Sequence, residues 1–386
     1  MPVFIKNNKY DNLINNVVYA SFFVHQLFFL FSVSAFARSA QSIRNVVNSI
    51  IILSFAVMSL TIIYYFFRGK FSPKEIVVYA IIAVPLLISL YNYRVVMVIS
   101  NLFYAAIFKN VNCKKSLKIV LYATVIGFCI NILFYIFTPY KGIVGQSYPD
   151  GSLRMRNGLG FSYAYITSYY YLTIVLMVIL AYDKFNLMTY IILTVLNIVV
   201  FKFTDTKAAF TYTMLAIIMH LMFIRFKNQF IYNIFKIGVI VIYPIATLLA
   251  IFLPVFYVRG NRIWDILNRI VNGRLSLTQR SFIDCGWTWF GQSAALWKEG
   301  VRWADSAIVL MLIQNGLIVL IMSVIFMTFF SYMAVKINHK PLMIVMFVMA
   351  IRAIFDLGFM TMQLGPVIIM FYDVYYKYKN RIICDY

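Results

Sequence analysis

The feature that most constrains this chain is a series of apolar runs, each long enough or nearly long enough to cross a bilayer. A transmembrane helix needs about 20 predominantly apolar residues. Backbone polar groups in lipid must be hydrogen-bonded internally, and the alternating pattern of barrel strands is missing, so we predict helices. The runs cover residues 15–37, 46–67, 76–92, 95–108, 118–138, 159–182, 187–203, 208–225, 236–258, 305–330, 341–355 and 358–373.

These runs predict an all-α, polytopic membrane protein with about 12 transmembrane helices. Hydrophobic residues make up 63% of the 386 residues, more than a soluble core can bury. Repeats, low-complexity tracts and large soluble domains do not interrupt the pattern, so residues 1–386 are expected to form a single integral membrane domain. A long polar segment, residues 259–304, precedes the tenth run.

The lysines and arginines of the short loops set the expected orientation, because cytoplasmic loops carry an excess of both. With the basic loops inside, both termini are cytoplasmic and the outward loops are about 38–45, 139–158, 203–207 and 259–304. The residues that fix this assignment are Lys6, Lys9, Arg68, Lys70, Lys74, Lys109, Lys114, Lys115, Lys118, Lys184, Arg225, Lys227, Lys336, Lys340, Lys377, Lys379 and Arg381.

The net charge of +22 does not indicate nucleic-acid binding, because the basic residues lie in short groups between apolar runs. Anionic lipid headgroups account for much of the excess. The arginines of the two long outward loops need a separate explanation, and they indicate an anionic ligand on that side of the membrane.

Arg154 and Arg156 end the loop at 139–158, ahead of the next helix. Guanidinium groups bind phosphate oxygens bidentately, and N–H groups at a helix start add positive potential. The alternative is that both arginines extend to lipid headgroups. In the larger loop, Arg274 and Arg280 are six residues apart, which is not a strict helical face.

A third group of charges lies in the turn Lys202-Phe203-Thr204-Asp205-Thr206-Lys207. Thr204, Asp205 or Thr206 could cap the following helix. Capping leaves the lysines unexplained, because positive charge at a helix start opposes the macrodipole. Charges at a membrane boundary are costly unless they are paired or bind a ligand. An Asp–Lys pair and an anion cradle that includes Lys207 both remain open.

Aromatic residues near these charges are candidates for stacking on sugar rings. Tyr165 and Tyr169 are four residues apart and share a helix face. An interfacial aromatic belt is the simpler explanation for these tyrosines. Trp287 and Trp289 suit either a carbohydrate-stacking surface or one that rests on the membrane.

The candidate bases are carboxylates of the large loop, Asp305 and Asp284. Asp305 also has an ordinary interpretation as the N-cap of the tenth helix. The histidines are isolated from one another and the four cysteines lack metal-ligand spacing, so we expect no metal and no cofactor.

In order along the chain, four motifs resemble those of bacterial Wzy-type polysaccharide polymerases, which join lipid-linked repeat units of O-antigen, capsule or exopolysaccharide. The likeness covers the second half of the chain and the span count. Asp356 departs from the pattern, since a glutamate is expected at that membrane edge. The motifs are Arg-x-Arg-Asn-x-Leu-Gly-Phe at 154–161, Thr-x-Thr-Lys at 204–207, Gly-Arg-Leu at 273–275 with Phe-Gly at 290–291, and Asp-Ser-Ala-x-Val-x-Met-Leu-x-x-Asn-Gly at 305–316.

The resemblance implies a glycosyltransferase of the bacterial plasma (inner) membrane that uses no nucleotide sugar. It implies transfer of a growing glycan from undecaprenyl diphosphate to an incoming lipid-linked repeat, with membrane lipids, a chain-length regulator and a flippase as partners. Diphosphate binding would fall to Arg154, Arg156, Arg274, Arg280 and Lys207.

Other functions stay open. A lipid-linked oligosaccharide flippase could also have about twelve spans, but it should show two similar halves, which this sequence lacks. An O-antigen ligase is the closer alternative, although such ligases typically carry a histidine in an outward loop and none occurs here. A structural scaffold would leave the outward arginines unexplained.

Overall fold

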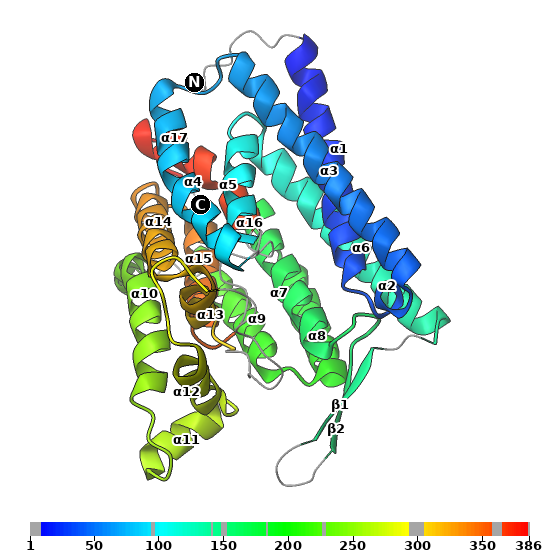
Figure 1. Ribbon diagram of the computed structural model, residues 1–386, viewed down its shortest axis with the longest axis vertical. Coiled ribbons are helices and arrows are strands. Elements are labelled where there is room, and N and C mark those ends of the chain that lie inside the picture. Colours follow the sequence, from blue (N-terminus) through cyan, green and yellow to red (C-terminus); the bar gives the residue numbers. More distant parts are fainter. Residues whose placement is uncertain are drawn as a thin grey trace. The chain divides into compact units, whose positions relative to one another are not determined.

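The structure is a computed structural model, and it describes residues 9–93, 97–139, 142–147, 153–182, 184–225, 229–292, 305–356 and 365–384. Its elements are helices apart from one two-stranded hairpin (Figure 1). Contacts divide the chain into two compact units. The first contains residues 1–70 and 106–227 with the final residue, and the second contains 71–105 and 228–385. No linker or change of composition in the sequence marks this division.

The first unit is built around α7, whose residues are nearly all buried. α6, α8 and α9 pack against α7, and α1 packs against α3 and α6. The elements of this unit are α1 (Lys9–Ser32), α2 (Ala35–Ser39), α3 (Gln41–Phe67), α6 (Cys113–Phe137), β1 (Ile143–Ser147), β2 (Leu153–Asn157), α7 (Ala164–Ala181), α8 (Leu187–Thr204), α9 (Lys207–His220) and a π-helical turn (Leu221–Arg225).

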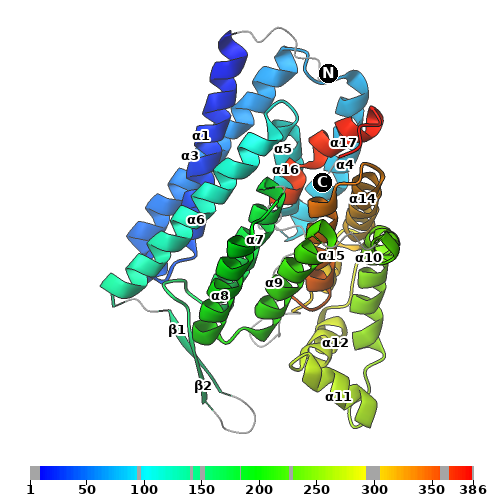
Figure 2. The same cartoon turned by 180° about the vertical axis from the view of Figure 1, so that it is seen from behind.

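One end of the first unit collects three loops that are far apart in sequence. The Ala35 amide donates to the Gly160 carbonyl (2.8 Å) and the Ser162 amide to the Val33 carbonyl (3.0 Å). The Ser168 hydroxyl donates to the Thr204 hydroxyl (2.7 Å). The α1–α2 turn, the base of the β-hairpin and the α8–α9 turn therefore lie together, as Figure 2 also shows.

The opposite end of the same unit carries basic residues. The Lys70 ammonium lies 3.2 Å from the Asp11 carboxylate, and the Lys109 ammonium donates to the Lys70 carbonyl. At the start of α6, the Lys115 and Lys118 ammonium groups lie over the rings of Tyr19 and Tyr182. The basic loops around Lys70, Lys109 and Lys115, which the sequence assigns to one side of the membrane, thus lie at one end of this unit.

In the second unit, α10 packs against α14 and α15, and α13 contacts α4, α14 and α15. α5 (Met97–Phe108) runs across the boundary between the units. The other elements are α4 (Pro73–Tyr93), α10 (Gln229–Val255), α11 (Arg262–Ile270), α12 (Arg274–Cys285), α13 (Ala307–Asn315), α14 (Leu317–Lys336), α15 (Lys340–Phe355), α16 (Gly365–Ile369) and α17 (Phe371–Lys379).

The tenth predicted helix is broken at Gly316. The backbone there has φ +89°, which separates α13 from α14. The segment after α12 docks on this break, because the Leu317 and Ile318 amides donate to the Thr288 and Trp289 carbonyls. A Cβ on Gly316 would lie 2.4 Å from the Gly291 nitrogen, so both positions require glycine. The Phe-Gly and Asn-Gly motifs meet at this contact.

Within the described residues, nine helices are long and apolar enough to cross a membrane. They are α1, α3, α4, α6, α7, α8, α9 with its π-turn, α10 and α14. α5 and α15 are shorter, with 12 and 16 residues. The run at 358–373 falls partly outside the described residues. The all-helical membrane fold is confirmed, whereas the count of twelve stays a prediction.

Candidate functional site

The second unit brings together three charged residues from segments far apart in sequence. The Arg274 Nη2 lies 2.8 Å from Asp356 Oδ1, and its Nε lies 3.5 Å from Asp305 Oδ2. Arg274 is the first residue of α12, Asp305 precedes α13, and Asp356 follows α15. We call these three residues the arginine–carboxylate cluster.

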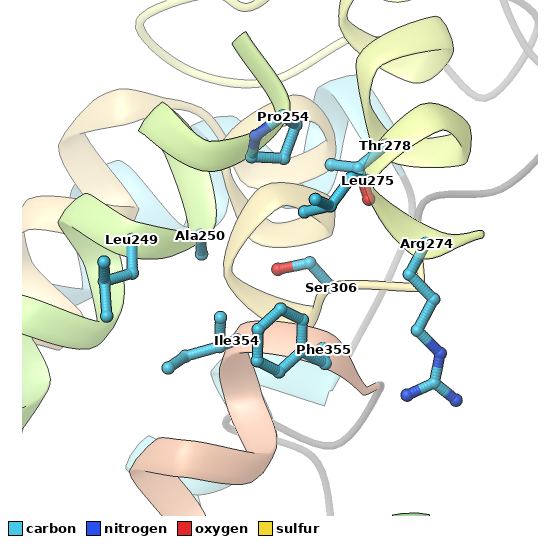
Figure 3. A pocket seen from close by; sticks show the side chains of 9 residues that line it. All are labelled: Leu249, Ala250, Pro254, Arg274, Leu275, Thr278, Ser306, Ile354 and Phe355. Carbon is cyan, nitrogen blue, oxygen red and sulfur yellow. The ribbon is translucent and has the colours of Figure 1, made fainter. Parts of the chain in front are cut away.

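Packing of α12 fixes the position of Arg274. The Leu275 and Thr278 side chains, three residues apart on α12, are buried. Figure 3 shows them turned towards Pro254 and Ser306, while the Arg274 side chain extends away from these residues. The cavity that remains there is about 10 Å³, room for about one water molecule. A ligand can therefore approach Arg274 only from its exposed side.

The two carboxylates of the cluster are in different environments. The Asp356 side chain is 5% exposed and that of Asp305 is 41% exposed. Burial raises the pKa of the Asp305 carboxyl above its ordinary value of 3.8; Arg274 counteracts this and Asp356 adds to it. Asp356 is thus the buried anchor of the guanidinium, and Asp305 is the accessible carboxylate and the candidate proton acceptor.

The N-cap interpretation of Asp305 is wrong. Ser306 caps α13, since its hydroxyl accepts from the Val309 amide, and the same hydroxyl donates to the Ala353 carbonyl. Asp305 is therefore one residue before the N-cap of α13. The Ala307 amide also donates to the Asp356 carbonyl (3.1 Å), which ties the start of α13 to the end of α15.

The pairing of Asp356 with Arg274 was not predicted. On α15, Arg352 lies one turn before Asp356 and is 2% exposed. The available signal in the sequence is Arg352 inside an apolar run, with Asp356 four residues later. Charges at the end of an apolar run are expected to have partners in the folded protein.

The other predicted residues of α12 and its continuation lie apart from the cluster. Arg280 is exposed and about 120° around the helix axis from Arg274. Asp284 is exposed near the end of α12. Trp287 and Trp289 are both exposed, with ring centroids 5.9 Å apart and planes nearly perpendicular. The carbonyl of Trp289 is held by α14, so this ring pair is presented by a fixed backbone.

In the first unit, Arg154 and Arg156 lie on β2 and not at a helix start. Their Cα partners on β1 are Gln146 and Val144, and α7 begins only at Ala164. Positions 154 and 156 occupy the same face of the strand. The side chain of Arg154 lies outside the described residues, and that of Arg156 is half-buried.

The rest of the motif at 154–161 builds the base of the hairpin. Asn157 donates to the Tyr135 hydroxyl and accepts from the Leu159 amide. A Cβ on Gly160 would lie 1.8 Å from the Asn131 carbonyl oxygen. These contacts explain Asn157 and Gly160 by packing.

Only one of the two tyrosines that the sequence suggests for sugar stacking is exposed. Tyr169 is 5% exposed, so its ring faces the protein, whereas Tyr165 is 42% exposed. Tyr165 stacks on Tyr163 with ring centroids 5.7 Å apart, and the Arg38 guanidinium lies 5.4 Å from the Tyr163 ring centroid. The exposed aromatic pair at this end is therefore Tyr163 and Tyr165.

Lys207 begins α9 and is exposed. Within the described part of the chain, no carboxylate lies within ion-pair distance of its ammonium. Thr206 holds the N-cap position without capping, because its hydroxyl donates to the Thr204 carbonyl. Asp205 ends α8 in a left-handed conformation, with φ +45°. Among these residues Lys207 does not form the Asp–Lys pair, which was one of the two alternatives left open by the sequence.

Among the residues with described positions, no group of three or more His, Cys, Asp or Glu side chains is arranged to hold a metal ion. The fold and these sites define the chain as a multi-pass α-helical membrane protein. Comparisons with models of protein families, with curated proteins and with solved structures found no match.

Proposed function

We propose that this protein is a glycosyltransferase that polymerises lipid-linked oligosaccharide repeats on the outer side of a bacterial plasma membrane. The observation that carries the proposal is the Arg274 guanidinium held between a buried and an accessible carboxylate. The order of motifs that resembles Wzy-type polymerases runs through two of these residues, Arg274 and Asp305. The orientation follows from the distribution of lysine and arginine in the loops.

The donor would be a growing glycan on undecaprenyl diphosphate, and the acceptor a hydroxyl of an incoming lipid-linked repeat. The acceptor oxygen forms a bond to the anomeric carbon of the donor, and the bond from that carbon to the diphosphate oxygen breaks. The hydroxyl proton passes to the Asp305 carboxylate, and undecaprenyl diphosphate leaves. Because a diphosphate is already a good leaving group, the protein needs mainly to orient the lipids and neutralise charge.

The asymmetry of the cluster assigns different roles to the two carboxylates. The Arg274–Asp305 contact is long at 3.5 Å, and Asp305 is accessible, so an arriving phosphate oxygen can replace this carboxylate on the guanidinium. Asp305 is then released to accept the proton. The 2.8 Å contact with buried Asp356 holds Arg274 in place during the exchange.

The remaining candidates have supporting roles in the proposal. Trp287 and Trp289 offer two exposed rings on a fixed backbone, which suits stacking on glycan. Arg154, Arg156 and Lys207 belong to the first unit, and diphosphate binding by them rests on the motif resemblance alone. Arg280, exposed and on another face of α12, is assigned no role in the reaction step.

A carrier of lipid-linked repeats is the second candidate. The observation that favours it is the α13–α14 break at Gly316, since interrupted helices are common in transporters. Deletion of the gene in its host distinguishes the functions by surface product. Loss of a polymerase leaves single repeats outside, loss of a carrier leaves none, and loss of a ligase leaves polymer that stays on its lipid. The proposal predicts single repeats.

A further inference from the structure

Helix α11 is amphipathic in the opposite sense to a helix on a water-soluble protein. Ile263, Ile266, Leu267 and Ile270 follow the i, i+3, i+4, i+7 pattern of one helix face. All four are exposed, and Ile263 and Ile270 are each 70% exposed. No residue of α11 is buried. The apolar face therefore points away from the protein.

The polar face of α11 is the one that contacts the protein. Asp265 accepts from the Gly260 amide and from the Tyr257 hydroxyl. The Asn268 side chain accepts from the Ser276 amide of α12 and donates to the Tyr257 hydroxyl. In water this arrangement would leave the isoleucines exposed, which costs free energy. An apolar medium at the outward face removes this cost.

The exposed apolar surface continues from a membrane-spanning helix. α10 ends at Val255, which is exposed, and exposed Phe256 and Val258 follow it towards α11. Figure 1 shows α11 beyond the end of α10. A chain that leaves the end of a membrane-spanning helix enters the headgroup region first, so α11 is expected there.

Two exposed arginines border the apolar face. Arg262 and Arg269 are seven residues apart and lie beside Ile266 around the helix. Arginines at the edge of an apolar face extend to headgroups while the apolar side chains enter the acyl region. Their charge complements an anionic leaflet surface.

We propose that α11 lies in the plane of the bilayer surface, with its isoleucines in the acyl boundary and Arg262 and Arg269 bound to anionic phospholipid headgroups. This contact does not require any particular reaction at Arg274. It does set the depth of Arg274, because Asn268 is hydrogen-bonded to the first turn of α12. The arginine–carboxylate cluster would then lie at headgroup level, where the diphosphate of a lipid-linked substrate is found.

The test measures the depth of α11 in the full chain, reconstituted in nanodiscs of phosphatidylcholine with phosphatidylglycerol. Nitroxide labels are attached at Ile263→Cys, Ile266→Cys and Ile270→Cys in a variant whose native cysteines are serine, with Arg280→Cys on α12 as the matched control. Relaxation by oxygen, which partitions into lipid, is compared with relaxation by a water-soluble nickel complex. We expect oxygen to dominate at the three α11 positions and nickel at position 280.

Two results would overturn the proposal. Strong nickel relaxation at all three positions means that α11 is in water. Exclusion of both agents means that another protein, or a second copy of this chain, covers the face. Because cysteine replacement can impair folding, a benzophenone amino acid at Ile270 in the otherwise native chain provides an independent readout. Lipid-sized adducts support the proposal, and adducts of protein size contradict it.

A second arm tests the arginines. Adducts formed at Ile270 should be enriched in phosphatidylglycerol over its bulk fraction, by about fivefold for each arginine that binds a headgroup. The variant Arg262→Gln/Arg269→Gln should lose this enrichment while the nitroxide depths stay the same. Equal enrichment in the variant would contradict headgroup binding. These measurements record lipid contact and not polymer synthesis, so their failure is distinguishable from failure of the proposed function.

Discussion

The Arg274 guanidinium lies 2.8 Å from the Asp356 carboxylate, although 82 positions separate the two residues in sequence. The contact joins the start of α12 to the end of α15 and leaves the Asp305 side of the guanidinium more open to solvent. Anchoring by Asp356 and proton transfer to Asp305 can therefore be tested by separate substitutions.

The anchoring role predicts the effect of Asp356→Asn. Removing one partner of a buried ion pair costs about 3–5 kcal/mol, and retention of Asp305 as a second partner puts the expected loss at the lower end. We expect a lower thermal midpoint of the purified protein and slower elongation. Asp356→Glu, which keeps the charge, should recover part of both. A variant with unchanged stability and unchanged rate would contradict the anchoring role.

The raised pKa of Asp305 predicts a pH dependence. A carboxyl with a pKa above 3.8 is protonated at a higher pH than usual, so the base form is lost as the pH falls through that raised value. The rate of elongation should therefore show an acid limb above pH 3.8. General-base catalysis contributes about 10²–10⁴-fold. Because a diphosphate is a good leaving group, we expect Asp305→Asn to slow elongation by only about 10²-fold. The same substitution should remove the acid limb of the pH profile.

Asp284→Asn serves as the comparison, because Asp284 is the other carboxylate that the sequence suggests and is exposed on α12. It should keep both the rate and the acid limb. If instead Asp284→Asn removed the limb and Asp305→Asn did not, the base would be Asp284.

The contact between Gly291 and Gly316 predicts that alanine is not tolerated at either position. A Cβ on Gly291 would lie 2.1 Å from the Gln314 carbonyl oxygen, and both glycines have positive φ. Gly316→Ala should undock the segment that carries Trp287 and Trp289, seen as faster protease cleavage there and a lower thermal midpoint. Gly238→Ala on α10 is the matched control, since its Cβ would meet nothing nearer than 4.0 Å.

Hydrophobic runs predicted the helices well, because the requirement for internal hydrogen bonds in lipid leaves few alternatives. The break at Gly316 depends on a contact with Gly291, which the sequence does not predict, and the hairpin around Arg156 lies where the sequence predicts a loop. Local sequence patterns also do not indicate that α11 packs against the protein by its polar face. Such features depend on tertiary contacts that local patterns do not contain.

The candidate site was predicted in part. Arg274 and Asp305 were both selected from the sequence, and they lie together. Their partner Asp356 was noted only as a departure from a motif, because its role requires the end of α15 to return beside α12. Tyr169 was selected by helical spacing, which cannot tell the buried face of α7 from the exposed one.

The most direct test of the central claim is elongation by purified protein supplied with a lipid-linked repeat, comparing Arg274→Ala and Arg274→Lys with the unaltered chain. Loss of one electrostatic contact to a developing charge costs about 10²–10³-fold in rate. We predict such a loss for alanine and a partial one for lysine, which keeps the charge without the bidentate fork. Normal long polymer from a correctly inserted Arg274→Ala protein would contradict the account.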